Sequence, residues 1–358
     1  MAAGALTTAL SELHRKHGAE MGVWFGCEMP DSFGDWEKEH RYFRESAALV
    51  DKNYRAYLEF TGPDRGRYLN ALLTGDIKGL MENQGVISLF LNPQGHIQAE
   101  IETYMYGEAL LCVTFAMIRE KLIPALDKYI IMDDVTLTDR TEELATLGVE
   151  GPKTAELVRQ VSGVELGEMQ ELESRVANAG GVECRVTKRS VGGLTSAEFL
   201  FARGKAEEVW SFLKEAVERV GGGAAGFKAL NAVRLESGVP WFGYDFGEKQ
   251  IPHEAGLQES HISYTKGCYT GQEIVERVRS RGQVNRARVS LQFEGAPPAT
   301  GAVLTADGKE MGFVTRTGYS PTVKAWIGMG YVRREMSAAG SRLELPGSTA
   351  TVMATPIS

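Results

Sequence analysis

A strand pattern that breaks at Gly-Pro and resumes as a helix pattern occurs twice in this chain. The first break is Gly62-Pro63, after the alternating run Y-R-A-Y-L-E-F, and the second is Gly151-Pro152. Proline fits the first turn of a helix, where its missing N–H is not needed, so each break marks a strand-to-helix junction. Further strand patterns flank both strand-to-helix junctions. We therefore expect two related α+β units, each an antiparallel sheet with helices packed against it.

Residue spacing places the remaining elements of these units. Leu6, Leu10 and Leu13 predict a short amphipathic helix at the N-terminus. The expected strands are 54–60, 86–92, 97–106, 110–115, 135–137, 144–150, 184–190 and 198–202, and further helices are expected over 118–129, from 154 and over 205–220.

The chain has 358 residues, enough for more than one core. From Arg286 onward helical patterns are nearly absent, and Asp307-Gly308 is a hairpin turn signal. We expect a small β-barrel or sandwich there. The predicted fold class is α+β, with domains 1–134 and 135–250 for the two lobes, 251–284 for a loop and an Arg-rich helix, and 285–358 for the β-barrel.

Gly221, Gly223 and Gly226 match the dinucleotide-binding pattern G-x-G-x-x-G literally. That fingerprint requires a strand before it, because the glycines must follow a strand and open a helix. Here the preceding residues E-V-W-S-F-L-K-E-A-V-E-R-V are helical in pattern. We interpret the glycines as a helix terminator and connector.

The segment Lys266–Gln283, K-G-C-Y-T-G-Q-E-I-V-E-R-V-R-S-R-G-Q, is called the signature segment below. Helical spacing of its three aliphatic residues predicts a helix over 272–281 with one narrow buried stripe. Glu273 and Arg277 can pair at i, i+4, whereas Arg277 and Arg281 repel at the same spacing. An anionic partner across the two arginines would relieve this repulsion, since arginine binds carboxylates in a bidentate manner. A solvated face whose charges pair elsewhere explains the same pattern.

Cys268 stands between two glycines, Gly267 and Gly271, that allow a sharp bend and a close approach to a ligand. Lys266 before it and a helix N-terminus behind it favour the thiolate form. A lone cysteine is more often a small buried hydrophobe. Because the neighbours here are mostly Lys, Gly, Tyr and Thr, we expect an exposed functional thiol.

Composition and residue spacing argue against several classes of protein. The net charge of −8 argues against a general nucleic-acid binder. The four cysteines form no C-x-x-C pair, and His253 and His261 match no ligand spacing, so neither a disulfide framework nor a metal site is expected. The sequence has no long apolar run and no signal-like core at its start. We expect a cytoplasmic protein with no membrane partner and no direct nucleic-acid partner.

The string K-G-C-Y-T-G-Q-E, followed by Arg277 and the Arg281-Gly282 pair, resembles the signature of the YgfZ family. Members of this family are folate-binding proteins related to the T-protein (aminomethyltransferase) of the glycine cleavage system. R-L-E-S-G-V-P-W-F-G-Y-D and I-P-H-E-A resemble segments of the wider T-protein superfamily, and this looser similarity covers most of the chain. The resemblance implies a three-lobed T-protein-like fold, with two related antiparallel α+β lobes and a C-terminal β-barrel.

The resemblance also implies that tetrahydrofolate, or a folate derivative, lies in a central hole between the lobes. The glutamate of the superfamily's R-L-E segment contacts the pterin, which carries over to Glu236, and a carboxylate can accept two hydrogen bonds from an aminopyrimidinone edge. From the residues alone, a helix-end ion pair with Arg234 or Lys228 is the simpler interpretation of Glu236. The expected site consists of Cys268 as the functional thiol and, for folate binding, Glu236, Lys266, Tyr269, Gln272, Arg277 and Arg281.

The YgfZ resemblance implies a role in making or repairing iron-sulfur clusters of client proteins, including enzymes that modify tRNA. One thiolate can hold a cluster transiently but cannot supply the four ligands of a stable one. A folate-dependent aminomethyltransferase or other one-carbon transferase is the alternative, and a redox sensor using Cys268 is a third class. The T-protein carries aspartates in G-x-I-x-D-D, whereas this chain has G-H-I-Q-A-E, so Ala99 and Glu100 replace the pair. Because a displacement of about 1 Å can cost on the order of a hundredfold in rate, glycine-cleavage aminomethyltransferase activity is not expected.

Overall fold

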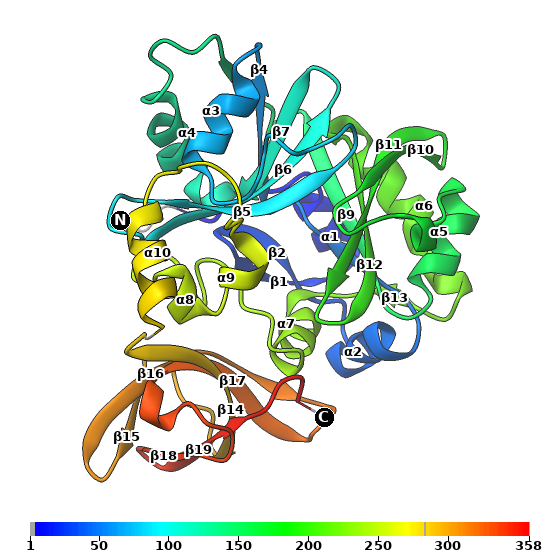
Figure 1. The fold of residues 1–358 in the computed structure, drawn as a ribbon. Coiled ribbons are helices and arrows are strands. Elements are labelled where there is room, and N and C mark those ends of the chain that lie inside the picture. The colour runs from blue at the N-terminus through cyan, green and yellow to red at the C-terminus, as the bar shows by residue number, and fades with distance from the viewer. Residues whose placement is uncertain (1–3, 283, 358) are drawn as a thin grey trace. The chain divides into compact units, whose positions relative to one another are not determined.

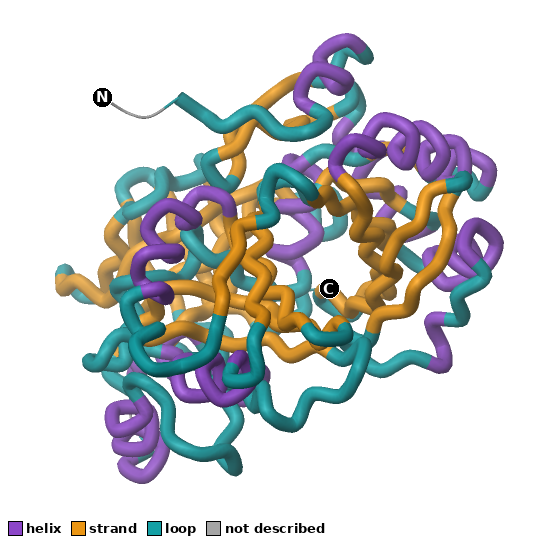
Figure 2. The backbone as a smooth tube through the Cα atoms, turned by 90° about the horizontal axis from the view of Figure 1, so that it is seen from above, coloured by secondary structure: helices purple, strands orange, loops and turns teal. Residues whose placement is uncertain are grey.

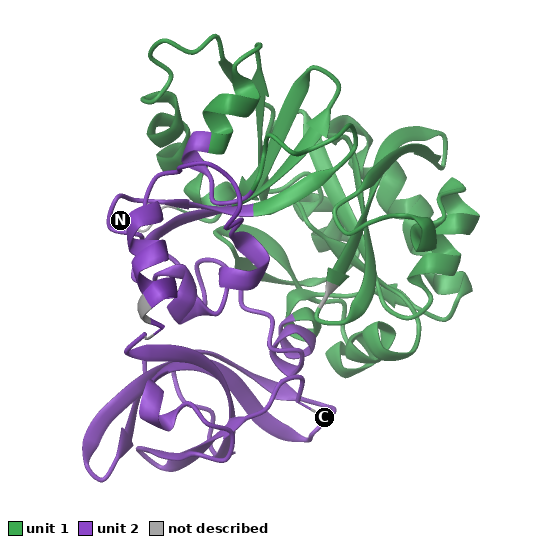
Figure 3. Cartoon of the chain, viewed as in Figure 1, with its two compact units in different colours: residues 1–70, 76–87, 101–230 green, residues 71–75, 88–100, 231–358 purple. Residues whose placement is uncertain are grey.

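The computed structural model describes residues 4–282 and 284–357. The chain divides into two compact units (Figure 3). Unit 1 consists of Met1–Asn70, Asp76–Ile87 and Ile101–Leu230, and unit 2 of Ala71–Gly75, Ser88–Glu100 and Asn231–Ser358.

Helices and strands alternate along the backbone of unit 1, whereas the C-terminal part of unit 2 is built from strands (Figures 1 and 2). The helices are α1 (Ser11–Lys16), α2 (Trp36–Glu45), α3 (Arg65–Leu72), α4 (Arg119–Asp127), α5 (Thr154–Ser162), α6 (Ala206–Arg219), α7 (Phe227–Glu236), α8 (Pro252–Ala255), α9 (Gln258–His261) and α10 (Gln272–Arg281). Short 3-10 helices cover Ala116–Ile118, Leu166–Glu168, Arg203–Lys205 and Arg334–Met336.

The strands form two sheets, a hairpin and a barrel. They are β1 (Glu20–Trp24), β2 (Cys27–Ser32), β3 (Ala48–Asp51), β4 (Arg55–Thr61), β5 (Gly85–Leu91), β6 (Ile97–Tyr106), β7 (Ala109–Phe115), β8 (Thr136–Asp139), β9 (Leu144–Glu150), β10 (Ser174–Ala179), β11 (Val182–Val191), β12 (Leu194–Ala202), β13 (Gly223–Ala224), β14 (Arg286–Gly295), β15 (Val303–Ala306), β16 (Lys309–Ser320), β17 (Ala325–Arg333), β18 (Arg342–Leu345) and β19 (Ser348–Met353). One sheet has the order β5-β6-β7-β4-β8, the other β10-β11-β12-β9-β3-β13, and the barrel closes as β14-β17-β16-β15-β18-β19.

The two Gly-Pro junctions take the same structural position. β4 ends one residue before Gly62 and β9 ends one residue before Gly151, and a helix begins three residues after each glycine. Both glycines have positive φ angles, 96° and 133°. A Cβ atom would lie 2.2 Å from the carbonyl oxygen of Asp134 at Gly62 and 2.6 Å from that of Ser46 at Gly151. The predicted repeat is therefore present in the structure, and both junctions require glycine.

Helices α5 and α6 cover one face of the second sheet (Figure 1). Val209, Leu213 and Val217 lie on one face of α6, at the i, i+4, i+8 spacing of a helix, and all are fully buried. They pack with buried side chains of β9 and β12, including Leu147 and Phe199. This apolar contact forms the main core of unit 1.

A buried ion network joins the two sheets within unit 1. Arg55 of β4 donates two hydrogen bonds to the carboxylate of Glu198 on β12, at 2.5 and 2.7 Å. Arg189 of β11 lies 2.8 Å from the carboxylate of Glu102 on β6. Burial by itself would raise the pKa of Glu198, but the guanidinium groups of Arg55 and Arg189 lower it to about 2. Glu198 is therefore ionised at neutral pH.

The barrel has the predicted hairpin turn between β15 and β16. Asp307 and Gly308 have φ angles of 50° and 71°, the left-handed conformation that a two-residue hairpin turn favours. Buried Leu291, Leu304 and Val314 fill the interior. The predicted fold class is confirmed: two antiparallel α+β parts precede a small β-barrel, with the parallel β13–β3 pair as a departure from antiparallel pairing.

The N-terminal helix differs from the prediction. α1 begins at Ser11, so Leu6 and Leu10 precede it. Leu6 instead pairs as an isolated bridge with Cys27, with its N–H donating to Gly26 and its carbonyl accepting from Glu28. These hydrogen bonds to the β1–β2 hairpin replace the helical ones, which helical spacing of leucines cannot reveal.

The prediction for the G-x-G-x-x-G glycines is confirmed. α6 ends at Arg219, and Gly221 follows with a φ of 81°, which terminates the helix. A Cβ atom on Gly226 would lie 2.3 Å from the carbonyl oxygen of Asp31. Gly221 therefore ends the helix, and Gly226 permits close backbone packing.

No helix within the described residues has the length and apolar character needed to cross a membrane.

Candidate functional site

The signature segment, whose Gln283 lies outside the described residues, belongs to unit 2. Its helix α10 covers Gln272–Arg281, as predicted, between Gly271 and Gly282, which both adopt left-handed φ angles. Val275 is buried, whereas Ile274 and Val278 are half-buried. The aliphatic stripe is thus narrow, and most of the helix surface is polar.

The start of α10 rests on the turn 92–95, which joins β5 to β6. A Cβ atom on Gly271 would lie 2.7 Å from the carbonyl oxygen of Asn92, and one on Gly95 would lie 2.8 Å from Cγ2 of Ile274. Both glycines therefore permit a backbone approach that a larger residue would prevent. The predicted close approach at Gly271 is to the protein's own chain.

Residues 71–75, called the strap below, hold the loop that precedes α10. The Lys266 ammonium group donates to the carbonyl oxygens of Leu73 and Gly75, at 2.5 and 2.7 Å. The N–H groups of Ser263 and Thr270 donate to strap carbonyls as well, at 2.9 and 3.2 Å. Charge-assisted hydrogen bonds are among the stronger ones, so Lys266 fixes the loop to the strap from within unit 2.

Cys268 lies on this loop, between Lys266 and Thr270, and is exposed. The predicted exposure is confirmed. Cys27, Cys112 and Cys184 are buried, and burial raises the pKa of their thiols to about 11, 12 and 11. Thiolate chemistry at neutral pH is therefore suppressed at the three buried cysteines, and Cys268 is the one open to solvent.

Tyr269 and Gln272 follow Cys268. Tyr269 is buried, with the Lys266 ammonium 5.2 Å from its ring centre. Its hydroxyl is buried and has no hydrogen-bond partner among the described residues, and burial raises its pKa. A buried hydroxyl without a partner is uncommon and fits a site that a ligand completes. Gln272 is half-buried at the first position of α10.

The arginines of α10 differ in their surroundings. Arg277 is exposed and forms no ion pair with any residue that the structure describes, so the predicted pair with Glu273 is not found there. Arg279 lies 3.6 Å from Glu276. The side chain of Arg281 lies outside the described part of the structure. Arg277 thus offers its guanidinium for an anionic ligand.

Glu236 ends α7 and is fully buried, and its carboxylate accepts a hydrogen bond of 2.5 Å from the Ser320 hydroxyl. On the same helix, Arg234 forms a fully buried ion pair with Asp245, whose other oxygen accepts from the Thr315 hydroxyl at 2.6 Å. The R-L-E and G-Y-D strings are therefore joined through Arg234 and Asp245. Both lie in unit 2, as does the signature segment.

A contact between a carboxylate and a histidine in unit 2 was not predicted. The Glu100 carboxylate lies 2.9 Å from Nε2 of His261, and Nδ1 of His261 lies 2.7 Å from the Ser260 hydroxyl. His261 is buried. Glu100 and His261 are 161 residues apart in the chain, so spacing alone could not bring them together.

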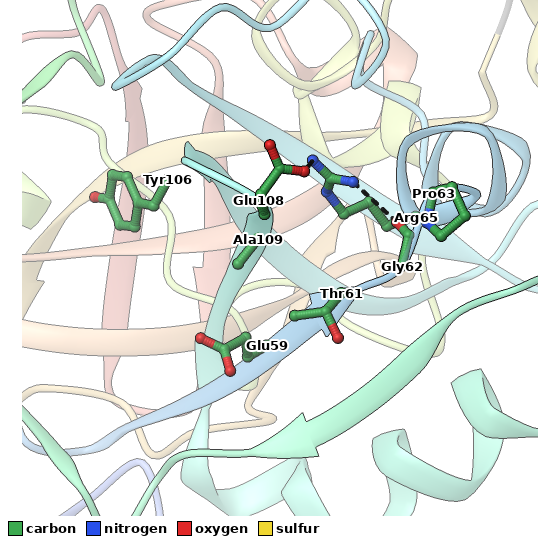
Figure 4. Close-up of a pocket in the computed structure, with 8 residues that line it drawn as sticks. All are labelled: Glu59, Thr61, Gly62, Pro63, Arg65, Tyr106, Glu108 and Ala109. Atoms are coloured by element: carbon green, nitrogen blue, oxygen red, sulfur yellow. Dashed lines mark hydrogen bonds and ion pairs between the residues drawn. The ribbon is translucent and has the colours of Figure 1, made fainter.

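Unit 1 has a surface pocket of about 380 Å³ beside the first Gly-Pro junction (Figure 4). Arg65 bonds to the carbonyl oxygen of Gly62 at 2.9 Å and faces Glu108 at 3.4 Å, while Glu59 lies across the pocket. None of the predicted site residues lines this pocket. Within the described ranges, no group of three or more His, Cys, Asp or Glu side chains is arranged to hold a metal ion.

Comparisons with known proteins agree with this architecture. The family "GCVT N-terminal domain" matches residues 10–262, and the family "Glycine cleavage T-protein C-terminal barrel domain" matches residues 286–358. The chain is similar to the aminomethyltransferase of Rubrobacter xylanophilus, with 30% identity over 92% of this chain and 87% of that protein. It is 28% identical to the aminomethyltransferase of Caldanaerobacter subterraneus, over 94% and 91% of the two chains.

A solved structure shows the same fold. The glycine cleavage system aminomethyltransferase T from Bartonella henselae superposes with a TM-score of 0.88 over 98% of each chain, at 23% sequence identity. At this identity the likeness establishes the fold.

Proposed function

The chain belongs to the glycine cleavage T-protein family, and from that premise we propose that it binds tetrahydrofolate and assists the assembly or repair of iron-sulfur clusters in client proteins. The clients include enzymes that modify tRNA, and the protein acts in the cytoplasm. The observation that carries the proposal is the exposed Cys268 on a loop that Lys266 fixes to the strap. The resemblance of K-G-C-Y-T-G-Q-E to the YgfZ signature supports the same choice.

The residues of unit 2 fit a folate. Glu236 offers a buried carboxylate for the aminopyrimidinone edge of the pterin, and Arg277 offers an exposed guanidinium for the glutamate carboxylates. The unpartnered hydroxyl of Tyr269 supplies a further polar contact. The proposed folate ligands are Glu236, Lys266, Tyr269, Gln272, Arg277 and Arg281. When bound, tetrahydrofolate would supply a one-carbon acceptor.

Cys268 is the proposed functional thiol. A thiolate binds iron, but one thiolate leaves the other ligand positions of a cluster to be filled from elsewhere. We therefore propose that Cys268 contacts a cluster or its precursor only while a client protein supplies the remaining ligands. Lys266 on one side of Cys268 and the Thr270 N–H on the other hold the loop on the strap, and the thiol between them is exposed.

Two experiments test this function. Titration with tetrahydrofolate compares wild type with Glu236→Ala and Arg277→Ala, and unchanged affinity in both variants would remove the binding proposal. Complementation of an iron-sulfur enzyme's activity, in cells lacking the endogenous protein, compares wild type with Cys268→Ser. We expect Cys268→Ser to bind folate normally and to lose the rescue, whereas full rescue would exclude a role for the thiol.

Aminomethyl transfer is the second candidate. The similar proteins named above are aminomethyltransferases and align with this chain over most of their length. Here Ala99 and Glu100 stand at the family's aspartate pair, and His261 engages the Glu100 carboxylate. Tetrahydrofolate-dependent release of ammonia from aminomethylated lipoyl protein, lost in Glu100→Gln, would favour this candidate over the iron-sulfur role.

A further inference from the structure

Two guanidinium groups share one carboxylate where α7 packs against the barrel within unit 2 (Figure 1). Leu235 of α7 packs with Ile327 and Met329 on the outer face of β17. Beside this contact, the side chain of Arg234 on α7 is fully buried, and Arg288 on β14 is half-buried. A guanidinium does not lose its proton in a protein, so both groups are charged. Buried charges are normally paired, which makes the supply of negative charge here the question.

Asp245 supplies the carboxylate, and its hydrogen-bonding capacity is largely used. One oxygen accepts from Nη1 of Arg234 and from the N–H of Trp241, and the other accepts from the Thr315 hydroxyl at 2.6 Å. Asp245 therefore balances the charge of Arg234 and leaves that of Arg288 uncompensated.

Arg288 has no ion-pair partner in the part of the chain that the structure describes. Its N–H groups donate to the carbonyl oxygens of Ala255 and Gly238, at 2.8 and 3.1 Å. Arg286, two residues earlier on β14, shows the contrast, because its guanidinium lies 2.9 and 3.1 Å from the two oxygens of Glu254. One positive charge beside α7 thus remains without a negative one.

The two unequal arginines converge on one atom. Nη1 of Arg234 and Nη1 of Arg288 lie 3.6 and 3.5 Å from the sulfur of Met329. Burial lowers the pKa of Arg234, and the charges of Arg316 and Arg288 lower it further, against the opposing effect of Asp245. Like charges so placed repel one another, and an anion between them would relieve the repulsion.

Two buried donors at this place lack acceptors. Nη2 of Arg234 and the hydroxyl of Tyr331 are buried and have no hydrogen-bond partner among the described residues. Tyr331 pairs directly with Arg288 across the β14–β17 ladder and lies two residues from Met329 on β17, so these three side chains share one face. Burial raises the pKa of Tyr331, which keeps its proton. Because buried polar atoms are nearly always paired, the two donors indicate a missing acceptor.

We propose that a small monovalent inorganic anion, with chloride as its simplest form, binds between α7 and the barrel. Nη2 of Arg234, the guanidinium of Arg288 and the hydroxyl of Tyr331 hold it. An ion that only accepts hydrogen bonds suits a place where the free groups are donors, and the half-buried Arg288 gives it access from solvent. The ion balances the second guanidinium and ties α7 to the barrel. This inference does not rest on the proposed folate function.

Thermal unfolding in two sodium salts tests the inference at constant ionic strength. As chloride replaces gluconate at about 200 mM, the unfolding midpoint of wild type should rise by about 2–4 °C. The rise should vanish in Arg288→Met and in Tyr331→Phe, which loses the hydroxyl but keeps the ring beside Phe313. Arg342→Met, at an exposed arginine of the barrel, should keep the wild-type rise. Equal midpoints of wild type in the two salts, or an undiminished rise in Tyr331→Phe, would overturn the site.

Bromide locates the ion, because its anomalous scattering identifies it in a crystal grown with bromide in place of chloride. A peak within hydrogen-bond distance of Nη2 of Arg234, absent from crystals of Arg288→Met, would support the site. Bromide found only elsewhere on the protein would overturn it.

Tetrahydrofolate separates this site from the proposed folate site. The rise in chloride should persist when tetrahydrofolate is saturating. Its loss would show that the ion only replaces a folate carboxylate, which would overturn the inference and leave folate binding intact. If tetrahydrofolate does not bind, the proposed function fails, and the comparison of the two salts still decides the anion site.

Discussion

Replacing Lys266 by methionine should release the Cys268 loop from the strap. The ammonium group of Lys266 donates to two carbonyl oxygens, of Leu73 and Gly75, and both of those residues are buried. Hydrogen bonds to a charged group contribute about 1.5–3 kcal/mol each, and the lower end of this range gives roughly 3 kcal/mol for the pair before solvent exposure is considered. Lys266 is only half-buried, and water can replace part of the interaction, which leaves about 2 kcal/mol.

A loss of about 2 kcal/mol raises the local opening equilibrium about thirtyfold. Native-state hydrogen exchange measures this local opening equilibrium at the Ser263 and Thr270 amides, which donate to carbonyl groups of the strap. We expect both to exchange about thirtyfold faster in Lys266→Met, while amides of the barrel core such as Leu291 are unchanged. Lys309→Met, at an exposed lysine of the barrel, serves as the control.

Two results would refute the reasoning. Exchange within about threefold of wild type at Ser263 and Thr270 would show that Lys266 does not hold the loop. Equal acceleration at Leu291 would show that the variant lowers global stability instead of releasing one loop.

Further predictions concern the start of α10, the α7 ion pair and the network of unit 1. Gly271→Ala should lower the free energy of unfolding, measured in urea, by on the order of 1–2 kcal/mol or more. Gly271 has a φ of 83°, and the carbonyl oxygen of Asn92 lies 2.7 Å from the position that the alanine Cβ would take. Gly267→Ala, with open space around it, should stay near wild type. Arg234→Ala should lower the free energy of unfolding by about 3–5 kcal/mol in the same assay, because it leaves the buried Asp245 carboxylate without its ion-pair partner. A decrease below about 1 kcal/mol would contradict the pairing. The lowered pKa of Glu198 means that its contribution is present above its ordinary value of 4.5 and is lost as the pH falls toward about 2. Wild type should therefore lose stability across that window more steeply than Glu198→Gln, and parallel acid-unfolding curves would exclude the effect.

Local signals predicted the fold well because they depend on neighbours in sequence. The residue patterns over 97–106 and 144–150 predict two strands at their observed bounds, and the two Gly-Pro pairs mark the ends of β4 and β9. The helix 272–281 is found where its aliphatic spacing and flanking glycines place it. In each case the residues that specify the element lie inside it or next to it in the sequence.

The site was less predictable because its contacts join distant parts of the chain. Lys266 was assigned to the acidic tail of folate from its charge, but the sequence gives no sign that carbonyl groups of Leu73 and Gly75 accept its hydrogen bonds. The contact between Glu100 and His261 spans 161 residues. The unpartnered hydroxyl of Tyr269 depends on the orientation of a buried side chain, which periodicity does not encode.

The attachment of the Cys268 loop to the strap bears on the order in which the protein acquires its structure. The two hydrogen bonds of Lys266 close chain separations of 193 and 191 residues. During synthesis the strap leaves the ribosome long before its partner exists, and closing so long a stretch is entropically slow compared with forming a hairpin. The exposed Cys268 thiol therefore acquires its final surroundings late, after the sheets of unit 1 have had time to form.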